Sequence, residues 1–150
     1  MKQEPRSKKP IEFRLKNIQV TNCSLRKPDQ VIKKNQNFGY SFTFGAHFDK
    51  ENSEIIIEIS SNIFLSPKQK SVVGEITIKV HFSINNFNDF IEGESHFAFP
   101  EDFIIMLISI SYSTLRGIVI EKTGSTLQHS IILPIINIKE LINKQKPKSK

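Results

Sequence analysis

The sequence predicts an α+β fold in which four antiparallel strands are followed by one long helix. Three segments alternate between apolar and polar or small side chains, over residues 38–48, 54–65 and 74–85. A period of two is typical of half-buried strands. The polar turns between these segments are short, which indicates an antiparallel meander. From residue 101 the alternation gives way to a largely apolar run, which predicts a helix over residues 101–122.

The first strand is expected over residues 11–20. Ile11, Phe13 and Leu15 alternate, and Ile18 and Val20 continue the pattern after a shift of one residue. Such a shift predicts a β-bulge near Lys16 and Asn17. The polar segment 23–37 contains a proline and is too long for a hairpin turn, so we expect a long connection there.

The predicted helix is apolar on nearly every side. Acidic residues Glu101 and Asp102 suit its N-terminus, and only serines interrupt the centre of the apolar run. One face can pack on the sheet, and the opposite face needs another cover. This opposite face could be covered in two ways: by other subunits, or by the extended strap of residues 127–136, which contains Pro134. A short helix over residues 138–145 is expected to end the fold.

The charge of the chain lies at its two ends. The formal net charge is +6, yet residues 11–143 carry 13 Lys and Arg against 14 Asp and Glu. We therefore predict a single domain over residues 11–143, between a basic disordered tail (1–10) and a Lys-rich tail (144–150). A nucleic-acid binder more often carries a basic stripe on its folded surface, so nucleic-acid binding through the tails is a minor alternative. The N-terminus lacks a secretory pattern and no apolar run is long enough for a membrane span, so a cytoplasmic location is expected.

Few residues suggest catalysis or metal binding. His47, His81, Glu54 and Glu58 fall on the polar faces of adjacent strands and could in principle bind zinc, but ordinary exposed polar residues explain them better. Cys23 is the only cysteine, and nothing local would activate it. Glu92 and Glu94 are expected in a solvated loop. We predict no catalytic residue, no metal site and no cofactor, so an enzyme is not expected.

Four motifs, in order, carry a resemblance to a known family. They are FRLKNIQVTNCSLRKP, EIIIEISSNIFLSPKQKSVVGEITIKVHFSI, FPEDFIIMLISISYSTLRGIVIEKTG and LPIINIKEL. Together they resemble the first strand and crossover, the third and fourth strands, the first helix and the proline-containing strap of the SecB family of bacterial protein-export chaperones. The resemblance spans residues 11–143.

The resemblance implies a two-layer fold, with the long helix and the short C-terminal helix on one face of the four-stranded sheet. It implies assembly as a dimer of dimers, a homotetramer, with long helices packed against those of other subunits. For this chain the implied oligomer-interface residues are Ile104, Ile105, Ile108, Tyr112 and Leu115. Unfolded chains would bind in apolar grooves near the crossover and the last helix, and the implied client-binding residues are Leu25, Val31, Ile32, Ile135, Ile136 and Leu141.

The chain also departs from the family. Typical members have an acidic sheet surface and C-terminal tail that dock on the translocation motor SecA, whereas this C-terminal tail is rich in lysine and lacks a zinc-binding end. These departures argue against SecA docking. The first functional hypothesis is a SecB-like chaperone or holdase that binds unfolded polypeptides. The alternative is a dedicated interaction partner on the same fold, linked to a toxin–antitoxin pair or a mobile element.

Overall fold

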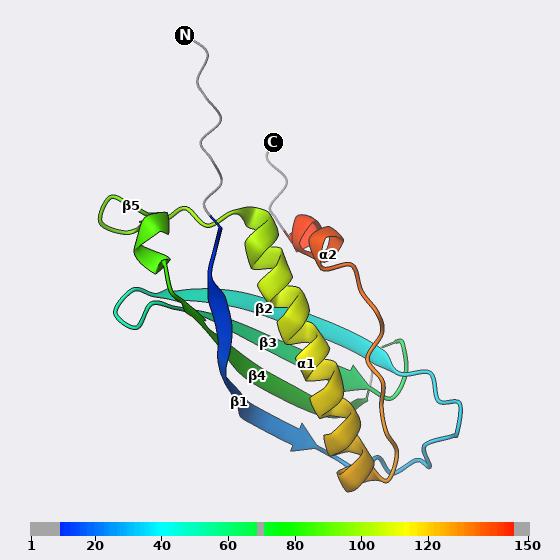
Figure 1. Ribbon diagram of the computed structural model, residues 1–150. Helices are drawn as coiled ribbons and strands as arrows, with labels where there is room; N and C mark the ends of the chain where they lie inside the picture. The colour runs from blue at the N-terminus through cyan, green and yellow to red at the C-terminus, as the bar shows by residue number, and fades with distance from the viewer. Residues whose placement is uncertain (1–9, 69–70, 146–150) are drawn as a thin grey trace.

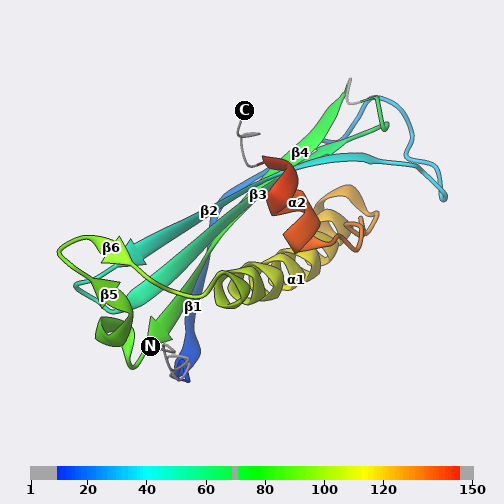
Figure 2. The same ribbon diagram turned by 90° about the horizontal axis from the view of Figure 1, so that it is seen from above.

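The structure is a computed structural model that describes residues 10–68 and 71–145. Most of the two predicted tails, residues 1–9 and 146–150, lies outside the described residues. The described chain forms one sheet, with a long helix lying across one of its faces (Figures 1 and 2).

The sheet has four antiparallel strands: β1 (Phe13–Leu25), β2 (Gly39–Asp49), β3 (Glu54–Phe64) and β4 (Val72–Ile84). Their spatial order is β1-β4-β3-β2, so β2, β3 and β4 form the predicted meander and β1 returns to lie beside β4. The strands β1 and β2 are therefore the two edges of the sheet. The predicted fold class, with both helices on one face, is confirmed (Figure 2).

Strand β1 contains the predicted bulge and continues further than predicted. Its register against β4 shifts between Leu15 and Asn17, and again between Val20 and Asn22. The strand was expected to end at residue 20, but pairing continues to Leu25, opposite Gly74. A Cβ atom at Gly74 would lie 2.5 Å from Leu25 Cδ2, so glycine permits the close approach that ends this pairing. The polar sequence of residues 21–24 hid the extension because an edge strand does not need an apolar face along its whole length.

The core lies between the sheet and helix α1 (Glu101–Leu127). Buried residues on the helix recur every three or four positions, which gives one continuous contact face; they are Phe103, Leu107, Ile108, Ser111, Tyr112, Leu115, Val119, Thr123 and Leu127. The helix was predicted to end at residue 122. It continues to Leu127 and ends at Gln128, which adopts a left-handed conformation with φ 55°.

Although no uninterrupted apolar run was expected to be long enough for a membrane span, α1 is long and apolar enough to cross one by length and composition alone. One face is packed against the sheet, however, and its apolar character on that side is explained by the core.

An extended strap follows α1 and leads into helix α2 (Ile138–Gln145). Side chains of α1 hold the strap. The Tyr112 hydroxyl donates to the carbonyl of Pro134, and Arg116 Nε donates to the carbonyl of Leu133 at 3.1 Å. The backbone N–H of Ile131 donates to Thr123 Oγ1 at 2.8 Å. The strap is thus fixed along one flank of α1, and it is extended, as predicted for this proline-containing segment.

The connection between β4 and α1 contains structure that the sequence did not reveal. It forms a 3-10 helix, η1 (Phe87–Phe90), and a small hairpin of β5 (Ile91–Glu92) and β6 (His96–Phe97). Aromatic rings fill the space between this hairpin and the sheet: Phe48 stacks on Phe97 at 5.0 Å between ring centroids, and Phe90 stacks on Phe99 at 4.9 Å. These contacts close one end of the molecule over the edge strand β2.

The Thr123 contact gives a stability prediction. Replacing Thr123 with Val keeps the shape of the side chain but leaves the buried N–H of Ile131 without its acceptor. We expect a loss of about 1–3 kcal/mol in the free energy of unfolding, measured by urea denaturation. The control Thr123→Ser keeps the hydroxyl and should lose less. Equal stability of Thr123→Val and the wild type would show that this contact does not hold the strap.

Candidate protein-binding site

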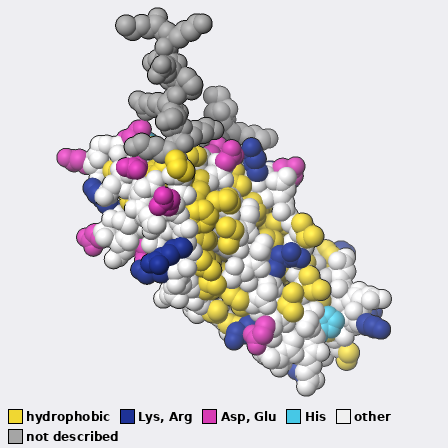
Figure 3. Space-filling model, in the orientation of Figure 1, with side chains coloured by type: hydrophobic (Ala, Val, Ile, Leu, Met, Phe, Trp, Pro, Cys, Tyr) yellow, Lys and Arg dark blue, Asp and Glu magenta, His cyan; other side chains and the backbone are white. Residues whose placement is uncertain are grey.

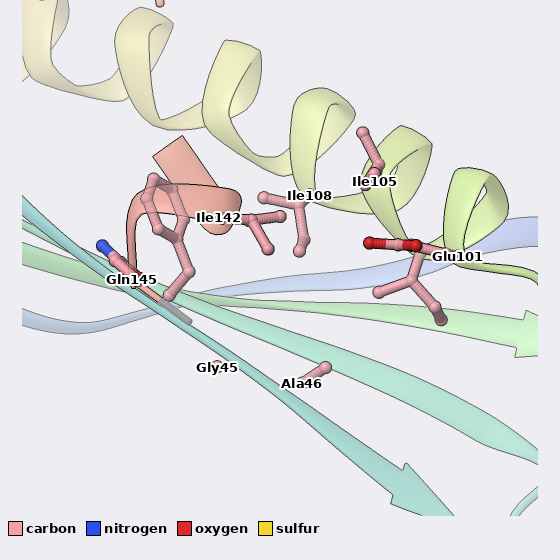
Figure 4. Close-up of a pocket in the computed structure, with 9 residues that line it drawn as sticks. Gly45, Ala46, Glu101, Ile105, Ile108, Ile142 and Gln145 are labelled. Carbon is pink, nitrogen blue, oxygen red and sulfur yellow. The ribbon is translucent and has the colours of Figure 1, made fainter. Parts of the chain in front are cut away.

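A predominantly apolar, open cleft of about 510 Å³ is named here the β2 cleft. It lies between strand β2, the first turns of α1 and helix α2. Figure 4 shows Ile108 of α1 and Ile142 of α2 pointing into the space above the strand that carries Gly45 and Ala46. The lining residues are Phe44, Gly45, Ala46, Glu101, Ile104, Ile105, Ile108, Ile142 and Gln145.

The cleft exists because an alanine interrupts a row of aromatic side chains on β2. On the helix-facing side of β2, alternate positions carry Tyr40, Phe42, Phe44, Ala46 and Phe48. The aromatic members are half-buried against the core, but Ala46 is exposed. A methyl group at that position leaves room that another ring would fill, and Ile104, Ile105 and Ile108 form the opposite wall.

Strand β2 is also a free edge of the sheet. It pairs with β3 through eleven consecutive residue pairs without a register shift, and no other strand of the described chain pairs with its outer side. An edge strand presents unpaired N–H and C=O groups. The β2 cleft therefore combines apolar side chains with backbone hydrogen-bonding capacity.

Two further hollows flank the strap and the crossover. The strap cleft, of about 500 Å³, lies between α1 and the strap; it is lined by Ile105, Ser109, Tyr112, Ser113, Arg116, Ile135, Ile136, Asn137, Ile138 and Lys139. The crossover cleft, of about 340 Å³, lies between residues 27–32 and 127–129. Ile105 contributes to both the β2 cleft and the strap cleft, so these two are neighbours.

The predicted client-binding residues are divided among these hollows. Val31 and Ile32 line the crossover cleft, and Ile135 and Ile136 line the strap cleft. Val31 and Ile135 are almost fully exposed, at 88% and 87%. Leu25 and Leu141 are partly buried and line none of the three clefts described here. The six residues therefore do not form one groove.

The predicted oligomer-interface residues lie on the sides of α1 that face the sheet and the β2 cleft. Ile108, Tyr112 and Leu115 are buried within the protomer, and Ile104 and Ile105 line the β2 cleft. Because the helix sequence is apolar on nearly every side, it did not indicate which helix face packs on the sheet. The exposed apolar residues of β1 and α1 form a separate set, named here the β1–α1 stripe: Phe13, Leu15, Ile18, Val20, Met106, Ile110 and Ile120. Figure 3 shows a band of hydrophobic side chains on this face of the molecule, over α1 and toward β1.

The β2 cleft is a candidate site that was not among the predicted ones, although the sequence contains a signal for it. Phe44 and Ala46 lie in the clearest alternating segment of the chain, and that segment precedes a short turn and follows a long connection. A sheet edge that is both regular and apolar could have been noted as a binding surface. The family resemblance implies binding at the crossover and the last helix instead.

The polar face of the sheet contains an ion-paired cluster, and no zinc site is seen among the described residues. Glu54 is buried; its carboxylate contacts the Lys16 ammonium and lies 3.2 Å from His81 Nδ1. No group of three or more potential metal-ligating side chains occurs in the described part of the chain. Cys23 is a free, exposed thiol. Glu92 and Glu94 are exposed, as expected for a solvated loop.

The sequence and the fold were compared with those of known proteins. No family model and no curated protein matches the sequence. Among solved structures, the SecB-like chaperone Rv1957 of Mycobacterium tuberculosis, in complex with a ChAD peptide from the HigA1 antitoxin, matches with a TM-score of 0.57. The match has 14% identity and covers 83% of this chain and 88% of that chain. This chain has a SecB-like fold. A protein of unknown function from Streptococcus agalactiae is similar with a TM-score of 0.42 and 14% identity, over 84% of this chain and 99% of that chain.

The SecB-like sheet of this chain has a mixed, rather than acidic, polar face. Lys79 lies 3.6 Å from Glu58, and Glu54 pairs with Lys16 and His81. The hydrogen bond from Lys16, with a smaller one from His81, lowers the pKa of Glu54, although burial opposes the shift. In the helix layer, burial raises the pKa of Tyr112 to about 12, which keeps its hydroxyl protonated as a donor to the strap.

The Glu54 cluster predicts a pH dependence. A carboxyl group whose pKa is lowered in the folded state stabilises the fold above its unfolded pKa, and this contribution is lost as the pH falls through the folded value. We expect Glu54→Gln to destabilise the protein near pH 7, and the difference from wild type to shrink below about pH 4.5. Denaturation at several pH values measures this. The control Glu58→Gln removes an exposed carboxylate and should change little; the same pH profile in both variants would contradict the prediction.

Proposed function

We propose that this protein acts without catalysis, as a SecB-like chaperone that binds extended apolar segments of other polypeptides in the β2 cleft. The observation that carries the proposal is an apolar cleft alongside a free, regular sheet edge. Burial of apolar surface contributes about 25 cal/mol per Å², so such a cleft can hold many different apolar segments. This breadth suits a holdase for non-native chains.

Strand addition explains how the segment would bind. An extended segment beside β2 forms backbone hydrogen bonds with its open edge, and every second side chain enters the cleft. The backbone bonds are independent of sequence, whereas the Ala46 gap and the isoleucine wall select apolar side chains. The neighbour of known structure supports peptide binding on this fold, because it was solved with a peptide from an antitoxin.

The same fold admits a narrower role as the partner of one protein. A dedicated partner would use the same cleft for one preferred segment, as in a toxin–antitoxin pair. The holdase and the dedicated partner therefore differ in the range of clients, and the experiment below separates them. SecA docking is not part of the proposal, because the polar face of the sheet is of mixed charge.

Assembly with further copies of the chain is the second part of the proposal. In the β1–α1 stripe, Leu15 is 48% exposed and Val20 44% exposed on β1, and Met106 and Ile110 are exposed on α1. Hydrophobic side chains form a continuous band over this face (Figure 3). Contiguous exposed apolar surface of this kind is typical of subunit contacts. We infer that a second copy packs on this stripe, which leaves the β2 cleft, on the other edge of the sheet, open to clients.

The cleft predicts the effect of one substitution. Ala46→Phe places a ring in the gap and should weaken binding of a fluorescent peptide of about ten alternating valine and threonine residues by about tenfold, which is about 1.4 kcal/mol. Fluorescence anisotropy measures the affinity. The control Thr43→Phe adds the same ring to the same strand on the opposite face, and should leave the affinity unchanged. Equal loss in both variants would argue against the β2 cleft.

The aggregation of a thermally unfolded enzyme, followed by light scattering, tests the holdase activity. We expect suppression near stoichiometric amounts for the wild type and its loss in Ala46→Phe. Peptide binding without suppression of any unfolded client would favour the dedicated partner. Absence of both activities would contradict the proposed function.

The β1–α1 stripe predicts the solution mass. We expect wild-type protein to exceed the protomer mass, and Leu15→Lys to lower it, because a buried unpaired ammonium opposes packing. Size exclusion with light scattering measures the mass. Val72→Lys, at an exposed apolar position on β4 outside the stripe, serves as the control. A monomeric wild type would refute the assembly.

A further inference from the structure

Arg116 carries a charge that the described structure does not balance. Its side chain is partly buried, and its Nε donates to the carbonyl of Leu133. No carboxylate of the described residues lies within ion-pair distance of it, and no hydrogen bond to its two terminal nitrogens is found there. Buried or partly buried charges are usually paired. The guanidinium is therefore anchored through Nε, and its two terminal nitrogens have no hydrogen-bond acceptor among the described residues.

The surroundings of Arg116 suit an anion. Beside Arg116, the strap cleft is lined by the polar residues Ser113 and Asn137 and by a second cation, Lys139, whereas the Ser109 hydroxyl already donates to the carbonyl of Ile105. Lys139 has only a long, exposed contact of 3.9 Å with Asp102, and such a pair contributes little. Figure 3 shows Lys and Arg side chains with hydrophobic side chains on both sides, on the strap side of α1.

The strap cleft also adjoins the site of proposed client binding. Ile105 lines both the strap cleft and the β2 cleft, so a polypeptide held at β2 can extend past Ile105 toward Arg116. Ile135 and Ile136 supply apolar contacts on the strap side. A ligand that spans the two clefts would therefore be a chain with apolar side chains and one anionic group.

We propose that the strap cleft binds an Asp or Glu side chain of the bound polypeptide, with its carboxylate on the terminal nitrogens of Arg116. This inference rests on the proposed function and names a client class: apolar extended segments that carry an acidic residue. A guanidinium matches the planar carboxylate with two parallel hydrogen bonds, and its flat shape is retained next to apolar groups. Because Nε is already fixed to the strap, little side-chain freedom is lost when the carboxylate binds.

A peptide series tests the inference on the full chain. The probes are fluorescent peptides of about ten alternating valine and threonine residues, in which a single glutamate is moved along the sequence, each paired with the matching glutamine peptide. We expect one or more positions at which wild-type protein binds the glutamate peptide about tenfold more tightly than the glutamine peptide. The preference should decrease with added salt.

Arg116→Gln should abolish that preference, while the glutamine peptide binds as before. Glutamine can still donate to the Leu133 carbonyl, so the strap keeps its anchor, and thermal unfolding of the variant verifies this. The control Lys79→Gln removes one positive charge from the opposite face of the sheet and should retain the preference. Equal binding of all glutamate and glutamine pairs would overturn this inference alone, whereas failure of every peptide to bind would overturn the proposed function and this inference together.

Two further outcomes would also overturn it. If inorganic phosphate binds in an Arg116-dependent way while no glutamate position is preferred, the cleft serves a free anion. If Arg116→Gln lowers the solution mass, the carboxylate comes from a second copy of this chain. We expect neither: phosphate at millimolar concentration should only compete with the glutamate peptides, and the mass should be unchanged.

Discussion

The packing of one helix on four strands is the constraint on which the rest of this structure depends. A helix with its side chains is about 10 Å wide, and four strands about 4.8 Å apart form a wider surface. Helix α1 therefore covers the centre of the sheet and leaves its margins. Core-facing residues of β3 and β4, such as Ile57 and Ile78, are fully buried. Those of the edges are not: Leu15 on β1 is 48% exposed and Ala46 on β2 lies open.

The two margins then differ because different elements lie beside them. On the β2 side, the strap and α2 run along α1, and the contacts from Tyr112, Arg116 and Thr123 fix the strap there. The remaining gap between β2, α1 and α2 is bounded on all these sides and becomes a cleft. On the β1 side no described element covers the margin, so the apolar side chains remain as an open stripe. A bounded cleft suits a flexible segment, and an open stripe suits another folded surface.

The sheet was predictable from the sequence because alternation is a local signal. Residues 38–48, 54–65 and 74–85 formed strands within one or two residues of the predicted bounds, and the shift at Lys16 marked a real bulge. The end of β1 was not predictable, because residues 21–25 are held by β4 and Gly74, far away in sequence. The same holds for the end of α1, where packing of Thr123 and Leu127 overrides the helix-breaking tendency of Gly124.

The site was less predictable than the fold because it depends on which side of an apolar helix faces the sheet. The helix run is apolar on most sides, so its sequence contained too little periodicity to separate the buried Ile108 from the exposed Ile110. An arginine near the C-terminal half of a helix, such as Arg116, can pair with an acidic side chain or with backbone carbonyls. The structure shows the carbonyl contact and no acid among the described residues. The sequence alone could not show that Arg116 lacks an acidic partner, because this depends on which carboxylates the fold brings near it.

The two edges also differ in their capacity for strand pairing, and this separates their roles. Strand β1 has two bulges and a lysine at the first of them, which are devices that discourage another strand from adding to an edge. Strand β2 has no bulge, proline or lysine over its eleven residues. A second copy at β1 must therefore pack mainly through side chains, whereas an extended segment at β2 can also use the backbone. The regular edge lies beside the bounded cleft and the irregular edge beside the open stripe, so backbone pairing and side-chain packing favour the same assignment of client to β2 and sister subunit to β1.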